Sequence, residues 1–145
     1  MKIYIKNQQR LIKVNQQRIR SHLRKALLLL RLQKTELSIL LVNDSKMRIL
    51  NRLYRGVDRT TDVLSFPQIS DSKFPHSEIL LGDIVINIHQ AKRQAAEHGL
   101  TFYEELKLLL IHGLLHLLDY DHEKGKYQKT KMRSKEKKLL DAISQ

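Results

Sequence analysis

Hydrophobic residues recur along the chain at the spacings of helices and strands. One set of these residues has the i, i+4, i+7 spacing that is typical of an amphipathic helix, and it consists of Ile19, Leu23, Ala26, Leu27 and Leu30. Residues 37–42, with the sequence LSILLV, form a short apolar run that predicts a buried strand. The same reasoning predicts further strands over residues 2–6, 61–66 and 79–86, and further helices over residues 45–55, 88–97, 102–118 and 127–143.

Polar residues and a glycine mark the expected ends of two of these helices. The Asn-Asp-Ser run at residues 43–45 offers side chains that can cap the helix over 45–55. Asn87 can cap the next helix, which Gly99 would end. We expect the packed side of the first of these two helices to consist of Met47, Ile49, Leu50, Leu53 and Tyr54.

The helix after Thr101 has a clear start signal and an unusual composition. Thr101 followed by Glu104 is the pattern of a capping box. From Leu106 to Leu118 the helix is apolar nearly all round, which predicts a buried helix at the centre of the fold. Four strands in one sheet and about five helices, with no linker rich in Pro, Gly or Ser, predict a single α/β (α+β) domain over residues 1–145.

Charge and cysteine content narrow the classes of function. The chain has 27 Lys and Arg against 15 Asp and Glu, and the resulting net charge of +12 favours a polyanionic partner, nucleic acid before an anionic membrane. Ten cations and no acid lie in residues 1–35, and eight cations lie in residues 123–138. Two solvated helix faces are the alternative interpretation of these runs. The absence of cysteine excludes disulfides, thiolate ligands and a cysteine nucleophile.

No segment has the length or composition of a membrane span or a signal peptide. A span needs about 20 apolar residues, whereas the longest apolar stretch, residues 106–118, is shorter and contains Lys107 and two histidines. We therefore expect a cytoplasmic protein that does not engage a membrane.

Three histidines in the sequence HGLLHLLDYDH form a candidate metal site. Residues four apart on a helix lie about 40° apart around its axis, so His112 and His116 point to the same side. His122 lies past the expected helix end, where the chain can turn back to supply a third ligand. Three protein ligands leave a fourth position open for water, which is the catalytic arrangement of zinc. Ordinary buried histidines are the alternative, but neutral imidazoles in apolar surroundings would need hydrogen-bond partners.

The residue next to the first histidine bears on the type of substrate. Metalloprotease helices have the pattern H-E-x-x-H, in which the glutamate is the general base. Here the corresponding residue is Gly113. The motif is therefore compatible with metal-dependent hydrolysis but disfavours a peptidase. The positive net charge makes a phosphodiester the natural substrate.

Three motifs in this order resemble a known family. HGLLHLLDYDH, LNRLYRGVDRTTDVLSFP at residues 50–67 and LLGDIVI at residues 80–86 are similar to the YbeY-like endoribonucleases, a group of bacterial rRNA maturation factors. The resemblance implies a zincin-like α/β domain with the histidine helix against a mixed sheet. It also implies one metal ion, usually zinc, and cleavage of single-stranded RNA in 16S rRNA 3′-end maturation and ribosome quality control.

The resemblance also implies roles for individual residues. His112, His116 and His122 match the metal ligands of the family, and His112 and Arg55 match its catalytic residues. The Arg55 guanidinium can bind a phosphate through two hydrogen bonds and stabilise the charge that develops on it. Asp83 is expected to have a structural role.

One further residue and two questions stay open at the level of sequence. Asp119 stands where the family has glycine, a residue that would let the helix end in a left-handed conformation. Three imidazoles suit zinc, nickel, copper or iron, and either water or the RNA 2′-hydroxyl could attack the phosphodiester. The first alternative function is a non-enzymatic RNA-binding ribosome-assembly factor whose structural metal takes a fourth ligand from Asp119, Asp121 or Glu123. The second is a metal-dependent hydrolase of another substrate, such as a peptide.

Overall fold

The computed structural model describes residues 1–68, 79–118 and 126–143, and the side chains of the last segment from residue 131. His122, Asp119, Asp121 and Glu123 lie outside these ranges. Along the chain the elements are β1 (Lys2–Asn7), α1 (Gln16–Leu29), β2 (Thr35–Val42), α2 (Asp44–Arg55), β3 (Val63–Pro67), β4 (Ile79–Asn87), α3 (Ile88–His98), α4 (Phe102–Leu117) and α5 (Lys126–Ile143).

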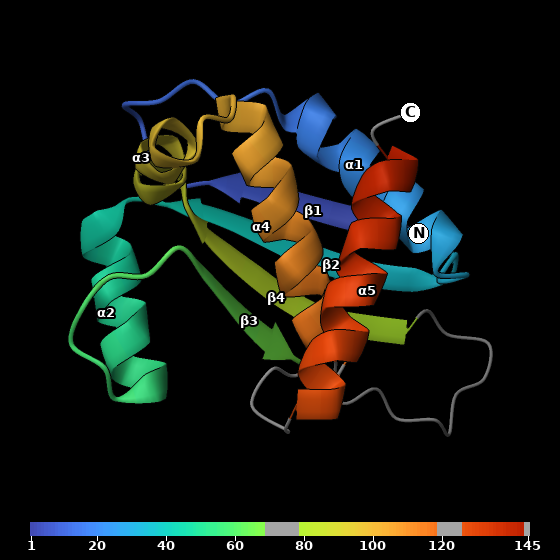
Figure 1. The fold of residues 1–145 in the computed structure, drawn as a ribbon. Coiled ribbons are helices and arrows are strands. Elements are labelled where there is room, and N and C mark those ends of the chain that lie inside the picture. The colour runs from blue at the N-terminus through green and yellow to red at the C-terminus, as the bar shows by residue number, and fades with distance from the viewer. Residues whose placement is uncertain (69–78, 119–125, 144–145) are drawn as a thin grey trace.

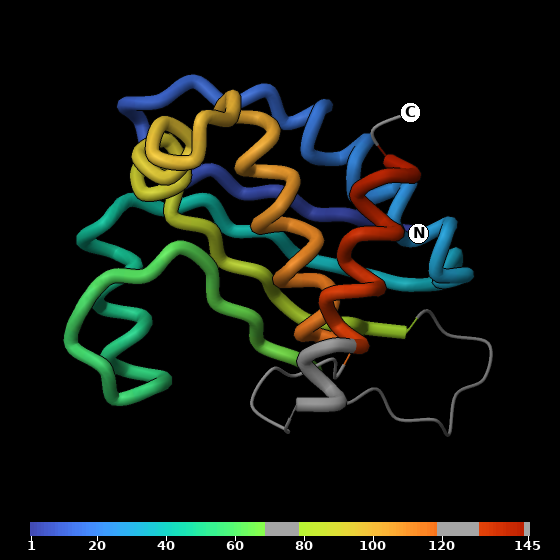
Figure 2. Tube along the Cα trace, in the orientation of Figure 1, coloured from blue at the N-terminus to red at the C-terminus, as the bar shows by residue number. Residues whose placement is uncertain are grey.

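The four strands form one mixed sheet in the order β1-β2-β4-β3 (Figure 1). β1, β2 and β4 are parallel, and β3 lies antiparallel to β4 at the edge. The chain trace shows β1 and β2 side by side although α1 separates them in sequence (Figure 2). The predicted α/β fold with a mixed four-stranded sheet and five helices is confirmed.

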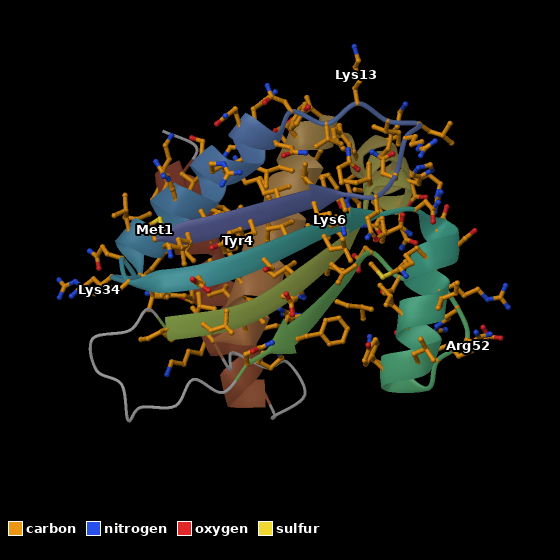
Figure 3. All side chains as sticks on the ribbon, turned by 180° about the vertical axis from the view of Figure 1, so that it is seen from behind. Met1, Tyr4, Lys6, Lys13, Lys34 and Arg52 are labelled. Atoms are coloured by element: carbon orange, nitrogen blue, oxygen red, sulfur yellow. The ribbon has the colours of Figure 1, made fainter. Side chains whose placement is uncertain are left out.

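The two faces of the sheet are covered unequally. One face packs against α1, α3 and α4, and its side chains include the buried Ile39, Ile84 and Ile86. The opposite face carries a smaller apolar cluster in which Val85 on β4 packs with Met47 of α2. Figure 3 shows this second face, where β1 presents the exposed Tyr4 and Lys6 and α2 lies to one side. The helices on the first face therefore form the main core, and α2 covers a limited part of the second.

α4 lies at the centre of the helical layer, as its apolar composition predicts. It packs against β3, β4, α1, α3 and α5 (Figure 1). Leu110, Leu114 and Leu115 on this helix have no exposed surface. Even so, none of the described helices has the length and apolarity that a membrane crossing requires.

The predicted helix ends are confirmed by hydrogen bonds. Thr101 and Glu104 form both bonds of a capping box at the start of α4. The Asn87 side chain accepts from the backbone N–H of Gln90 at the start of α3, and Gly99 ends that helix at φ 68°. Asn43 supplies the cap of α2 through a 2.9 Å bond from the N–H of Lys46.

Two sequence-based expectations are wrong in detail. β3 begins at Val63 and not at residue 61. The Asp62 carboxylate accepts from the Val63 N–H, and the Asp62 carbonyl accepts from the Asn87 N–H. The expected packed side of α2 is also too wide: Met47 is buried, but Ile49, Leu53 and Tyr54 are exposed. A helix that covers only part of one sheet face cannot bury so broad a stripe.

A buried carboxylate joins the end of α3 to α4. The Glu105 side chain is 2% exposed, and its Oε2 lies 2.9 Å from Nδ1 of His98. Its Oε1 accepts a hydrogen bond from Nε2 of Gln94. The hydrogen bond with Glu105 raises the pKa of His98 above its usual value. Protonated His98 therefore stabilises the contact between α3 and α4.

We predict a pH-dependent effect of His98→Gln on stability. Because the pKa of His98 is higher in the folded protein, its contribution is fully present below the unfolded-state pKa of about 6.5 and is lost as pH rises through the folded-state value. Thermal unfolding should therefore show the variant clearly less stable than wild type near pH 6, with the difference shrinking at alkaline pH. A difference that stays constant with pH would contradict the role of the charge.

Candidate active site

A cleft of about 610 Å³ opens between the end of α2, the strand β3 and the C-terminal half of α4. It brings together Arg55, His112 and His116, three residues that the sequence predicts to act together. The fourth predicted residue, His122, lies outside the described ranges. The remaining lining residues are Tyr54 and residues 61–66.

The two histidines face each other across one turn of α4. Their Nε2 atoms are 3.0 Å apart, and their ring centroids are separated by 4.6 Å. Two nitrogen ligands of a tetrahedral zinc ion, each about 2.0–2.1 Å from it, lie roughly 3.3 Å from each other. The Nε2 pair therefore fits two corners of one metal site.

A complete ligand set is not present within the described ranges. Among residues 1–68, 79–118 and 131–143, no group of three His, Asp or Glu side chains could hold a metal ion. The sequence-based third ligand, His122, lies outside these ranges, so the proposed set of three stays a prediction.

Gly113 sets the orientation of the histidines. A Cβ atom at this position would lie 2.8 Å from Cγ2 of Ile84 and 3.3 Å from Oγ of Ser65. Ser65 in turn donates a 2.9 Å hydrogen bond to the Gly113 carbonyl. Position 113 therefore faces the sheet, and a glutamate there would find no room. The general base of the H-E-x-x-H helix has no equivalent at this position.

Arg55 is the last residue of α2, and its neighbours leave its guanidinium exposed at the cleft. Gly56 ends the helix at φ 71°, and its N–H bonds to the Arg52 carbonyl. In the described part of the chain, no hydrogen bond or ion pair engages the Arg55 guanidinium. By contrast, Arg48 forms an ion pair with Asp58 at 2.9 Å. Arg55 is thus a cation at the cleft that no described carboxylate neutralises.

Polar side chains fix the segment that connects α2 to β3. Asn51 is 2% exposed, and its Nδ2 donates to the Arg59 carbonyl at 2.8 Å. Asn87, which is fully buried, donates to Oγ1 of Thr60 and to the carboxylate of Asp44. This wall of the cleft is therefore held by hydrogen bonds, whereas the α4 wall is held by apolar packing.

An aromatic pair in the cleft was not predicted from the sequence. Tyr54 and Phe66 both line it, with ring centroids 5.1 Å apart and planes at 64°. Tyr54 is 66% exposed, although its position suggested the packed side of α2. Its place directly before Arg55 was the available signal, because an exposed ring beside an arginine is suited to stack on a base.

Asp83 lies away from this cleft. It is half-buried on β4 next to Ile84, and alternation along the strand turns it to the second face of the sheet. There it lines a different hollow together with Phe66 and Val85. The expected structural role of Asp83 is compatible with this place and stays a prediction.

We predict that Gly113→Ala destabilises the protein although alanine is the better helix former. The methyl group would press on Cγ2 of Ile84, whose β-branched side chain has little rotational freedom in the strand. Overpacking of this kind costs about 1–3 kcal/mol, against a helix-propensity gain of about 1 kcal/mol. Denaturant unfolding should show a net loss of stability. A variant more stable than wild type would contradict the close approach of α4 to the sheet.

Comparison with known proteins identifies the family. The family model described as Endoribonuclease YbeY matches residues 4–144. A protein from Aquifex aeolicus named Endoribonuclease YbeY is 43% identical over 132 residues, which cover 91% of this chain and 86% of that protein. A protein of the same name from Roseiflexus castenholzii is 45% identical over 111 residues, which cover 74% of this chain and 70% of that one.

A solved structure also matches the fold. The solution structure of TM1509 from Thermotoga maritima is 27% identical in sequence and superimposes with a TM-score of 0.67, covering 97% of this chain and 88% of that one. The match to the family model and the identity to these relatives confirm the resemblance that the three motifs indicate. The chain belongs to the Endoribonuclease YbeY family.

Proposed function

We propose that this chain is a metal-dependent endoribonuclease that cleaves single-stranded RNA in the cleft between α2, β3 and α4. The observation that carries the proposal is the meeting of Arg55 with His112 and His116 in one hollow of about 610 Å³. An anion-binding cation and a pair of metal-binding imidazoles are the two parts that a metal-dependent cleavage of a phosphodiester needs.

The metal site consists of His112, His116 and His122, and zinc is the ion that we propose, with nickel or another divalent ion as the alternative. The 3.0 Å separation of the two Nε2 atoms supports a single ion at the cleft. When bound, such an ion supplies Lewis acidity and lowers the pKa of a coordinated water to about 7.

Arg55 binds the scissile phosphate. A guanidinium can donate two parallel hydrogen bonds to a phosphate, and this planar geometry orients the group as well as balancing its charge. The lack of a competing carboxylate on Arg55 among the described residues supports this role.

The preference for single strands follows from the aromatic pair. Unstacked bases can lie on an exposed ring, whereas the bases of a duplex are stacked on each other. The exposed Tyr54, backed by Phe66, offers such a ring beside Arg55. A base held on Tyr54 would place its own phosphate near the guanidinium.

The distribution of cations supports a path for the RNA from the cleft toward α5. Arg133 and Lys137 line a second hollow, of about 460 Å³, that shares His112 with the cleft. α1 lies on the other side of α4 from β3 and α2 (Figure 1). Two of its arginines also have partners within the protein, because Arg18 stacks on the Tyr103 ring and Arg20 donates to the Ile3 carbonyl. We therefore assign RNA contacts to α5 before α1.

The biological substrate that we propose is the 3′ end of 16S rRNA, with the ribosome as partner and a further role in ribosome quality control. We propose a cytoplasmic protein that acts without a membrane and folds as one domain over residues 1–145. The positive net charge of +12 suits an rRNA partner. Among the alternatives, a peptidase is disfavoured by the packing of Gly113. An assembly factor with a structural metal would bind RNA without cleaving it.

Removal of one ligand tests the metal site. His116→Ala should lower both the zinc content of the purified protein and its cleavage of single-stranded RNA, because the remaining imidazole of α4 cannot hold the ion with the same geometry. Elemental analysis gives the metal content. The control is His98→Gln, which alters a histidine on α3 and should keep full zinc content. Full metal occupancy in His116→Ala would remove His116 from the ligand set.

Substitution of the arginine tests the enzymatic function. Arg55→Ala should keep its metal and its fold but cleave RNA on the order of 10²-fold more slowly in single-turnover assays, because one charge-stabilising donor is lost. The matched control is Arg52→Ala, one turn earlier on α2 and exposed, which should cleave nearly as fast as wild type. Equal rates for all three proteins would contradict the proposed role of Arg55. A wild-type protein that binds metal and RNA without cleaving would favour the assembly factor.

A further inference from the structure

α5 carries an acidic residue at a position where its sequence would suggest an apolar one. Met132, Leu139 and Ile143 are buried and attach this helix to the main core. Glu136 lies four residues after Met132 and three before Leu139, so it belongs to the same stripe of the helix. Seven lysines and arginines occupy most other polar positions of α5. Partial burial of a carboxylate costs free energy unless the group has a hydrogen-bonding or oppositely charged partner, so we expect Glu136 to have one.

The partner that the structure provides is His112. Oε2 of Glu136 lies 3.6 Å from Nδ1 of His112, and the two side chains are 20% and 31% exposed. The other nitrogen of the same ring, Nε2, lies 3.0 Å from Nε2 of His116. The ring of His112 thus turns one nitrogen to the proposed metal position and the other to the carboxylate of α5.

This arrangement has a chemical consequence for the ring. A neutral imidazole carries its proton on one nitrogen and a lone pair on the other. If Nε2 is to bind a cation, the proton must be on Nδ1, and a carboxylate that accepts from Nδ1–H favours this tautomer and fixes the plane of the ring. The 3.6 Å separation exceeds the usual N–H···O distance of about 2.9 Å, and such contacts often tighten when a site is assembled.

We propose that Glu136 is a positioning residue that holds His112 in the orientation and tautomer required for metal binding. The inference rests on the proposed function, since it takes His112 as a ligand. In addition to its basic side chains, α5 therefore supplies an orienting carboxylate to the site from the C-terminal part of the chain. Glu136 itself does not touch the metal or the RNA in this role.

The test is the zinc affinity of full-length variants, measured by competition with a chromophoric chelator. Glu136→Ala should bind zinc about 10- to 100-fold more weakly, the usual effect of losing a carboxylate that orients a histidine ligand. Glu136→Gln keeps an oxygen that can accept from Nδ1–H, and it should recover most of the affinity. Asp141→Ala is the matched control, because Asp141 is the other acid of α5, lines the same hollow and is exposed. It should bind zinc as wild type does.

A second readout follows the ring directly. Nitrogen chemical shifts of the His112 imidazole distinguish the two neutral tautomers, and the metal-free Glu136→Ala protein should lose the preference for the proton on Nδ1. Circular dichroism establishes that the variants are folded. Should Glu136→Ala fail to fold, Glu136→Asp, which withdraws the carboxylate by one methylene group, takes its place in the comparison.

The outcomes separate this inference from the proposed function. Zinc affinity unchanged in Glu136→Ala, or lowered equally in Glu136→Ala, Glu136→Gln and Asp141→Ala, would overturn the inference, the second result pointing to net charge alone. A wild-type protein that binds no zinc would overturn both proposals. Weak zinc binding by Glu136→Ala, recovery in Glu136→Gln and no RNA cleavage by wild type would support the inference and overturn the proposed function.

Discussion

The close approach of α4 to the β3–β4 half of the sheet is the contact on which the site depends. At Gly113 the helix backbone lies so near the sheet that a single added carbon atom would meet Ile84, and Ser65 on β3 bonds to the carbonyl of the same glycine. Successive residues of a helix are about 100° apart around its axis. Because Gly113 faces the sheet, His112 and His116 turn toward the open side beside β3. The rotation of the helix, and with it the direction of both imidazoles, is therefore set by packing.

The edge strand β3 must itself lie close to β4 for this contact to form. Gly82 on β4 makes this possible, since a Cβ atom there would be 2.2 Å from the Phe66 carbonyl, and its φ of 135° strains any other residue. The opposite wall of the cleft depends on polar contacts. Arg93 on α3 binds the Asp44 carboxylate at the start of α2 and lowers the pKa of Asp44 to about 2. That carboxylate stays ionised near neutral pH and joins the start of α2, the helix that carries Arg55, to α3.

Local pairing, and not composition alone, decides which cations of the chain stay available to a ligand. Several cations of the described chain are engaged by carboxylates or by an aromatic ring, as Arg48, Arg93 and Arg18 are. Around the cleft, Arg55 on one side and Arg133 and Lys137 on the other remain directed at solvent-filled hollows. On α5 the acidic Glu136 lies beside His112, and this contact gives the basic helix a second relation to the site.

The amino-acid sequence by itself determined the order and type of the elements, the capped helix starts and the pairing of His112 with His116, because periodicity, capping and helical spacing are local properties. It also determined the family through three motifs. The tertiary structure alone decided that Tyr54 is exposed, that Arg55 lies in the same cleft as the histidines, that position 113 has no room for a side chain and that Glu136 faces His112. Each of these facts concerns elements that are distant along the chain, and their meeting depends on how the helices rotate and pack on the sheet, which no local pattern of residues specifies.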